Sequence, residues 1–324
     1  MSEGGADLVV SCGPARVRLV TNCPRMAHEF SGSACVRGML PAYRAEPATG
    51  AEGGFVVSVL RGDETRFVLT DRAATFTFRE TIEGDNKEVY FEVLFFLQTL
   101  FAHLLLVDHD LYLLKAAALV RGPRALLLLG EPGTGKSTVL EACLAASAEE
   151  LSFHDGKVLC DEELRLVGGN GSLAPRRWRP GMGRPEAVKD HPLAPMGAST
   201  LRAPVPVTEI VLPTLERYAP PEVFTAEPSR GPQAVGRVFQ SVSYFAGALH
   251  NHLDFFACPL PAFDDAGLVA RRYAYARRLA SLPVFRCYGE PGRMAAFVLA
   301  RLGAAPREAS SASLPSENER RRGF

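Results

Sequence analysis

A glycine-rich segment, residues 130–138, carries the strongest chemical signal in the sequence. It reads Gly-Glu-Pro-Gly-Thr-Gly-Lys-Ser-Thr and satisfies the pattern G-x-x-x-x-G-K-[S/T]. A run of four leucines ends at Leu129 and helical spacing follows from Ser137, which is the strand, loop and helix context that the pattern requires. The glycines let backbone N–H groups turn inward around phosphates, and the helix adds its positive N-terminal end. We expect nucleotide phosphates to be bound by Gly130, Gly133, Thr134, Gly135, Lys136, Ser137 and Thr138.

Two side chains of this loop have distinct expected roles. Lys136 should reach the β- and γ-phosphates of ATP, and the Ser137 hydroxyl should ligate Mg²⁺. The loop alone does not separate a kinase from an ATPase motor or a switch. A motor normally adds an acidic residue at the end of a strongly apolar strand, and residues 159–162 (Leu-Cys-Asp-Glu) are a poor version of it. The Ser-Gly-Gly signature of a transporter ATPase is absent.

A carboxylate, Asp155, follows the glycine-rich loop along the chain. In the segment Leu-Ser-Phe-His-Asp, Asp155 is placed to accept the proton of an acceptor hydroxyl or to bind Mg²⁺, and His154 to assist it. A solvated turn is the competing interpretation, because His-Asp-Gly is ordinary turn composition. Lys115 stands among apolar residues. It either pairs with a carboxylate or phosphate, since a buried charge is costly alone, or extends its ammonium group to the surface.

Arginines cluster further along the chain around Trp178. Planar guanidinium groups bind phosphate or carboxylate with two hydrogen bonds, so this segment is a candidate clamp for ATP or an anionic substrate. A solvated loop in an arginine-biased chain is the alternative. The candidate clamp residues are Arg176, Arg177 and Arg179, followed by Arg184.

A second cluster, His250, His252 and Asp254, invites comparison with a metal site. On a helix, His250 and Asp254 share one face while His252 points elsewhere. The ligand set is therefore incomplete, and we expect no metal at this position.

The periodicity of the sequence predicts the elements that position these residues. Short alternating apolar segments from residue 7 to about residue 85 indicate a β-rich N-terminal region. Residues 87–107 have the period of a buried helix. Further strands are expected over 111–120, 125–129, 157–160, 164–167, 205–212 and 284–288, and helices over 137–146, 234–258, 265–282 and 291–302.

Composition excludes several classes of protein. The 324 residues are 47% apolar, and 36 basic residues balance 36 acidic ones. Zero net charge removes the signature of a nucleic-acid or anionic-membrane binder. The seven cysteines are scattered and never in CxxC spacing, which indicates reduced thiols. Residues 1–8 lack a signal-peptide layout, and the apolar stretch 93–107 looks too short to span a bilayer. We expect a cytoplasmic protein with neither nucleic-acid nor membrane partners.

The region 109–303 resembles the nucleotide-binding core of the HPr kinase family. The resemblance lies in residues 113–120 (Leu-Leu-Lys-Ala-Ala-Ala-Leu-Val), the strand 125–129, the loop 130–138 and the segment 151–155; residues 205–216 and 279–288 are similar to the far end of related proteins. It implies an α/β (α+β) fold with a phosphoenolpyruvate-carboxykinase-like core on a mixed, largely antiparallel sheet. Together with the alternating pattern before it and the Ser/Pro/Arg/Glu-rich composition after it, we expect a β-rich domain at 1–108, a kinase domain at 109–303 and a disordered tail at 304–324.

The resemblance implies an ATP- and Mg²⁺-dependent kinase that phosphorylates a hydroxyl of a peptide or small metabolite in a biosynthetic pathway. The chain has Lys115 where the family has His, and His154-Asp155 where it has paired aspartates. It also lacks the family's downstream Glu-x-Arg-Gly segment, which argues against HPr as the acceptor. A non-catalytic nucleotide-binding regulatory or scaffold protein, or a P-loop ATPase, remains the alternative. Whether the chain forms homo-oligomers stays open.

Overall fold

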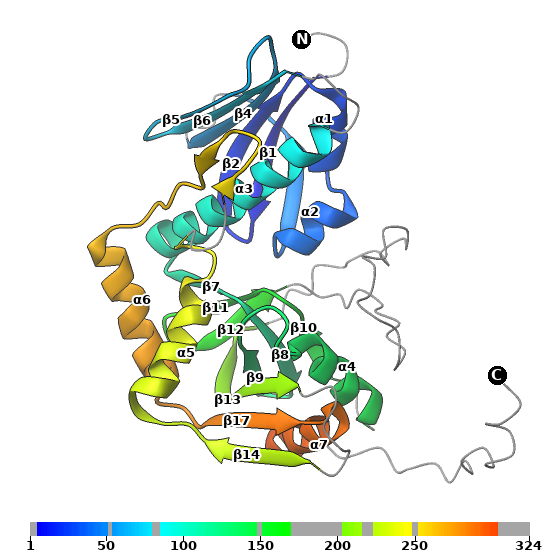
Figure 1. Ribbon diagram of the computed structural model, residues 1–324, viewed down its shortest axis with the longest axis vertical. Helices are drawn as coiled ribbons and strands as arrows, with labels where there is room; N and C mark the ends of the chain where they lie inside the picture. Colours follow the sequence, from blue (N-terminus) through cyan, green and yellow to red (C-terminus); the bar gives the residue numbers. More distant parts are fainter. Residues whose placement is uncertain are drawn as a thin grey trace, which may run out of the picture.

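A mixed α/β architecture with two separate large sheets organises the chain. The computed structural model describes residues 5–50, 54–79, 85–147, 151–169, 203–215, 223–247 and 252–303. The N-terminal sheet and its helices form one end of the molecule, and the larger sheet with its helices forms the other (Figure 1). The α/β (α+β) class expected from the sequence is confirmed at this level.

The N-terminal region is built on a six-stranded sheet in the order β3-β1-β2-β4-β6-β5. The alternating pattern of the sequence appears as alternating burial, for example at Phe76 and Phe78 on one face of β6. Two short helices, α1 (Pro24–Phe30) and α2 (Ala34–Met39), interrupt the strands and were not expected. The strands are β1 (Ala6–Cys12), β2 (Ala15–Thr21), β3 (Tyr43–Pro47), β4 (Phe55–Arg61), β5 (Arg66–Leu69) and β6 (Ala73–Phe78).

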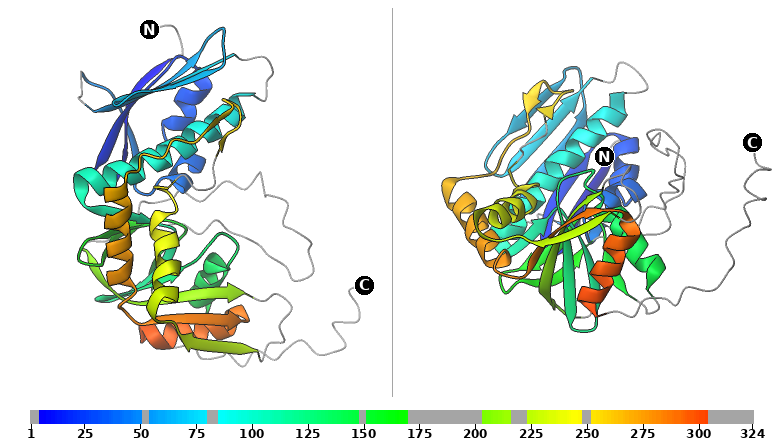
Figure 2. Two further views of the ribbon diagram at one scale, coloured as in Figure 1. Left: turned by 60° about the vertical axis from the view of Figure 1, so that its left-hand side comes forward. Right: turned by 60° about the horizontal axis from the view of Figure 1, so that its bottom comes forward.

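The long helix α3 (Asp85–His109) joins the two regions and packs along the N-terminal sheet (Figure 2). The helix is longer than the apolar stretch 93–107 that the sequence indicated, and Glu88–His109 is long and apolar enough to cross a bilayer by length and composition alone. However, 78% of its most apolar window is buried inside the structure. The helix therefore belongs to the core, as its period predicted.

The larger sheet holds the strands after α3. Strands β9, β13 and β17 run parallel, whereas the neighbouring pairs, such as β8 with β9, are antiparallel. The core order is β10-β8-β9-β13-β12-β11-β7, with β17 paired to β13 and β14 to β17. The strands are β7 (Leu111–Leu114), β8 (Ala116–Arg121), β9 (Arg124–Leu129), β10 (Ser152–His154), β11 (Val158–Asp161), β12 (Arg165–Gly169), β13 (Val205–Leu215), β14 (Phe224–Pro228) and β17 (Val284–Gly289).

Helices cover both faces of this sheet and build two cores. Helices α4 (Lys136–Ala146) and α7 (Pro291–Leu302) pack on one face, where Val139 and Val298 lie in one cluster. Helices α5 (Gly231–Ser243) and α6 (Ala266–Leu279) pack on the other. Side chains of β8 and β9 alternate between the two cores: Leu127 and Leu129 face α5 and α6, whereas Leu126 and Leu128 face α4.

Two expected elements were wrong. The run 111–120 is not one strand but two, β7 and β8, with Lys115 at the break between them. The helix expected over 234–258 ends at Ser243, and a two-stranded hairpin follows, β15 (His252–Leu253) and β16 (Cys258–Pro259). Apolar composition continued past the helix because this hairpin packs on the N-terminal core through Leu253 and Phe256.

Candidate functional site

The predicted phosphate-binding loop lies where several strand ends meet. Strand β10 is antiparallel to β8, and β8 is antiparallel to β9, so β10 and β9 run in the same direction. The residue after β10 and the loop after β9 are therefore at one edge of the sheet. Lys115 joins them, because it precedes Ala116, which pairs with Leu129 at the end of β9. The topology thus gathers Lys115, Asp155 and the loop.

Backbone conformation in the loop requires glycine. Gly130, Gly133 and Gly135 have φ values of 146°, 87° and 97°, in the region that disfavours other residues. A Cβ on Gly135 would lie 2.1 Å from Cγ of Leu215. Leu215 also donates its N–H to the carbonyl of Thr134 at 3.2 Å. The end of β13 therefore holds the loop in its turned conformation.

Lys136 is buried within the loop at 6% exposure. Its Nζ donates to the carbonyl oxygens of Gly130 and Glu131, both at 2.7 Å. Burial and, to a smaller extent, the charge of Lys115 lower the pKa of Lys136 from 10.5 to about 8, against the opposing effects of Asp155 and Glu131. An anionic phosphate beside Lys136 would favour its charged form.

Ser137 and Asp155 are in direct contact. The Ser137 hydroxyl donates to Oδ1 of Asp155 at 2.8 Å across a sequence separation of 18 residues. Hydroxyl and carboxylate oxygens are the ligands that Mg²⁺ accepts, together with phosphate oxygens and water. In addition, the N-cap of α4 is Gly135, which has no side chain to accept a hydrogen bond from the first-turn N–H groups. The residues fit a magnesium-bound phosphate.

The chain holds five lysines, and three of them meet here. The Nζ of Lys115 lies 5.3 Å from the ring centroid of Tyr244 and 5.7 Å from that of Phe245. The Nζ of Lys157 lies 5.6 Å from the same Phe245 ring. Sequence analysis selected Lys115 and Lys136 but missed Lys157. The scarcity of lysine, and its position two residues after Asp155, were the signals that could have identified it.

His154 is placed differently from its neighbour Asp155. The side chain is fully buried at 0% exposure, and its Cβ and Cγ lie 2.9 Å from where a Cβ on Gly169 would be. Asp155 follows the strand and is partly exposed. The structure therefore packs His154 against β12, and its assisting role stays a prediction.

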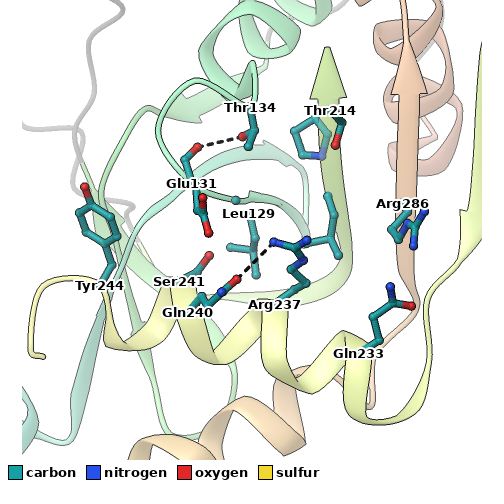
Figure 3. Close-up of a pocket in the computed structure, with 13 residues that line it drawn as sticks. Leu129, Glu131, Thr134, Thr214, Gln233, Arg237, Gln240, Ser241, Tyr244 and Arg286 are labelled. Atoms are coloured by element: carbon teal, nitrogen blue, oxygen red, sulfur yellow. Dashed lines mark hydrogen bonds between the residues drawn. The ribbon is translucent and has the colours of Figure 1, made fainter. Parts of the chain in front are cut away.

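A pocket of about 570 Å³ opens beside the loop on the β13 side (Figure 3). Helix α5 contributes a polar stripe, formed by Gln233, Arg237, Gln240 and Ser241. These residues are spaced so that they share the face of the helix that lines the pocket. Sequence reasoning missed this stripe because no local motif marks it, and only the tertiary structure brings α5 beside the loop. The pocket is lined by Leu129, Gly130, Glu131, Thr134, Leu212, Pro213, Thr214, Gln233, Arg237, Gln240, Ser241, Tyr244 and Arg286.

Two predicted clusters fall wholly or partly outside the described residues. Arg176, Arg177, Arg179 and Arg184 lie within 170–202, so their clamp role stays a prediction. His250 also lies outside. His252 is described, and its Nδ1 lies 3.0 Å from Oδ1 of Asp254.

Comparison with known proteins adds no relative. No protein-family model matches the chain, and no curated protein matches it with significance. The fold and the site therefore define the protein only as a mixed α/β chain whose glycine-rich loop joins a buried strand to a helix. The argument about function rests on the geometry of that loop and its surroundings.

Proposed function

We propose that this protein is an ATP- and Mg²⁺-dependent phosphotransferase with an HPr-kinase-like core, acting on a hydroxyl group. The observation that carries the proposal is the 2.8 Å hydrogen bond from Ser137 to Asp155 beside the buried Lys136. Phosphoryl transfer needs mainly positioning and charge neutralisation, and these three side chains supply both at one sheet edge. The largely antiparallel sheet around the loop supports the same architecture.

The residues divide the work of the reaction. Lys136 and the N–H groups at the start of α4 bind the phosphates. Mg²⁺, held by the Ser137 and Asp155 oxygens, would neutralise charge on the phosphates. The acceptor oxygen bonds to the γ-phosphorus as the bond from that phosphorus to the β–γ bridging oxygen breaks. Asp155 takes the hydroxyl proton, and ADP leaves.

The position of the pocket supports a proposal about the nucleoside. Asp155 and Ser137 mark the γ-phosphate end of the site on the β10 side of the loop. The pocket opens on the opposite side, towards β13 and β17. Its volume of about 570 Å³ lies within the usual range for small-molecule sites. We therefore assign the nucleoside to this pocket and the acceptor to the Asp155 side.

Nucleotide binding and acceptor-dependent ADP formation test the proposal. ATP with Mg²⁺ should raise the melting temperature of the wild type, because ligand binding stabilises by RT ln(1 + [L]/Kd). Lys136→Ala should abolish this shift, whereas Arg66→Ala, at an exposed position, should keep it. Unchanged ATP affinity in Lys136→Ala would overturn the site. ATP binding without acceptor-dependent ADP formation would instead favour a non-catalytic regulatory protein.

A further inference from the structure

The floor of the pocket beside the glycine-rich loop crosses three parallel strands. Val211 pairs with Leu128, and Leu212 pairs with Arg286. Leu129 of β9, Leu212 of β13 and Arg286 of β17 therefore form one row, and all three line the pocket. Neighbouring strands are about 4.8 Å apart, so the backbone of Arg286 is roughly 10 Å from Leu129, where the loop begins. Arg286 thus marks the end of the pocket that is farther from the loop.

Helix α5 passes over this floor and places one arginine near its middle. Gln233, in the first turn, is on the Arg286 side of the pocket (Figure 3). Near the other end of the helix, the carbonyl of Ser241 accepts the backbone N–H of Lys115 at 3.0 Å, next to β8. Arg237 is four residues from both Gln233 and Ser241, which is about 6 Å along the helix axis. It therefore lies between the far end of the pocket and β8, level with the start of the loop.

The guanidinium group of Arg237 faces the pocket without a carboxylate to neutralise it. Its Nη1 donates to Oε1 of Gln240 at 3.5 Å, a long hydrogen bond to a neutral amide. Glu131 lines the same pocket, yet Arg237 forms no ion pair with any residue that the structure describes. An arginine fork binds a phosphate group with two charge-assisted hydrogen bonds. A phosphate in the pocket is therefore a well-matched partner for Arg237.

The pocket and the buried lysine of the loop adjoin the same two residues. Gly130 and Glu131 line the pocket, and their carbonyl oxygens accept the hydrogen bonds from Nζ of Lys136. The proposed function puts the γ-phosphate on the Asp155 side and the nucleoside in the pocket. The inner phosphates of such a nucleotide must then lie along Gly130 and Glu131, which brings them past Arg237.

We propose that Arg237 binds the α- and β-phosphates of the nucleotide from the α5 side. The inference rests on the proposed function and adds a phosphate-binding residue that lies outside the glycine-rich pattern. Lys136 and Arg237 then contact the polyphosphate from two different elements. Negative charge builds up on the β-phosphate as its bond to the γ-phosphorus breaks, and a fixed guanidinium group at this position stabilises that charge.

Binding of ATP, ADP and inorganic triphosphate, each with Mg²⁺, tests this assignment by calorimetry. Arg237→Gln should weaken all three ligands at least about tenfold, one decade being about 1.4 kcal/mol. Arg237→Lys keeps the charge but loses the fork, so its affinities should lie between those of wild type and Arg237→Gln. The matched control is Arg277→Gln, which removes an exposed charge from α6 and should bind like the wild type.

Three results would overturn the assignment. The first is unchanged affinity for ADP and triphosphate in Arg237→Gln; Lys136-dependent ATP binding would then still support the proposed function. The second is a loss for ATP but not for ADP, which would move Arg237 to the γ-phosphate. The third is a loss in Arg286→Gln in place of Arg237→Gln, which would put the phosphates at the far end of the pocket.

Folding and the proposed function are controlled separately. Arg237 is exposed, so its variants should keep the melting temperature of the wild type without ligand, and Arg237→Lys decides the question if Arg237→Gln does not fold. If the wild type binds none of the three ligands, the proposed function fails and this inference fails with it.

Discussion

Asp155 and Ser137 form the contact on which the chemistry of this site depends. The carboxylate accepts the Ser137 hydroxyl at 2.8 Å and raises the pKa of both Lys136 and Lys157. A carboxylate in this position can take a proton from an acceptor or hold a metal ion. A substitution that tests Asp155 should therefore remove the negative charge of its carboxylate and keep its shape.

Asp155→Asn should separate binding from chemistry. The amide oxygen can still accept the Ser137 hydrogen bond, but the charge that binds a proton or Mg²⁺ is lost. We expect ATP affinity to change little and kcat to fall by about two decades or more. Asp254→Asn, whose side chain is 92% exposed, is the matched control. A comparable loss of ATP binding would make Asp155 structural instead.

The pKa of Lys157 predicts a specific pH dependence of stability. Burial and Lys115 lower this pKa from 10.5 to about 7, against the smaller opposing effects of Cys12, Asp155 and Cys35. Between these two values the unfolded chain binds a proton that the folded chain does not, so the free energy of unfolding rises with pH. The slope is at most about 1.4 kcal/mol per pH unit. Below pH 7 both states are protonated and the contribution is flat.

Lys157→Met removes this titration. The difference in unfolding free energy between wild type and variant, measured by chemical denaturation at pH 6, 7, 8 and 9, should change in favour of the wild type above pH 7. Comparing the two proteins cancels the titration of the cysteines and of Lys136. A pH-independent difference would show that Lys157 keeps an ordinary pKa.

At the scale of elements, the loop depends on β13 as much as on its own sequence. Thr134 and Gly135 contact Leu215, the last residue of that strand. The parallel arrangement of β9 and β13 brings their carboxyl ends together. Residues that are 80 positions apart therefore set the loop conformation jointly.

Two alanine substitutions in the loop should differ in a way that tests this contact. Gly135→Ala combines a positive φ with a 2.1 Å approach to Leu215, whereas Gly133→Ala has a similar φ of 87° and no neighbour within 4 Å. We expect backbone strain of about 1–3 kcal/mol in each and an additional packing cost of about 1–3 kcal/mol in Gly135→Ala. Urea denaturation measures both. Equal destabilisation would show that Leu215 yields freely.

The polar stripe of α5 makes a prediction about nucleotide recognition. Gln233 and Gln240 line the pocket but carry no charge. Replacing both by alanine should weaken ATP binding about tenfold and leave inorganic triphosphate binding unchanged, because only the nucleoside would contact these amides. Competition titrations measure both affinities. Equal weakening of the two ligands would remove the nucleoside from this pocket.

At the scale of the molecule, one hydrophobic core holds distant parts of the chain together. The N-terminal core includes Leu113 and Leu159 of the larger sheet and Leu253 and Phe256 of the hairpin. Glu92 of α3 also accepts the backbone N–H of Phe255 at 2.5 Å. The two ends of the molecule are therefore coupled in stability, and a change deep in the N-terminal core should be felt by both.

Phe96→Ala tests this coupling. Phe96 is fully buried and its ring lies 5.3 Å from that of Phe76 and 5.6 Å from that of Phe263. Its removal should cost about 3–5 kcal/mol, with one unfolding transition still reported by both ends. Leu69→Ala, at a 38% exposed position, should cost well under 1 kcal/mol. Two separate transitions in Phe96→Ala would show that the ends unfold independently.

The sequence by itself predicted those elements whose signals all lie within one short segment. The loop 130–135 follows a buried strand and precedes α4 because glycines at positive φ and a leucine run are local properties. The same holds for α6 and α7, whose starts are marked by the capping side chains of Asp265 and Glu290. Alternation likewise indicated the N-terminal strands.

Tertiary structure decided what depends on residues far apart in the chain. The break at Lys115 separates strands that pair with different partners, β11 and β10, which no local pattern encodes. The hairpin after α5 is apolar because it packs on the N-terminal core. The position of Lys157 beside Phe245 also depends on tertiary structure, because the strand order brings these distant residues together. Secondary-structure propensity depends on a few neighbouring residues, whereas the burial of a side chain and the charges around it depend on how the strands of the sheet are arranged.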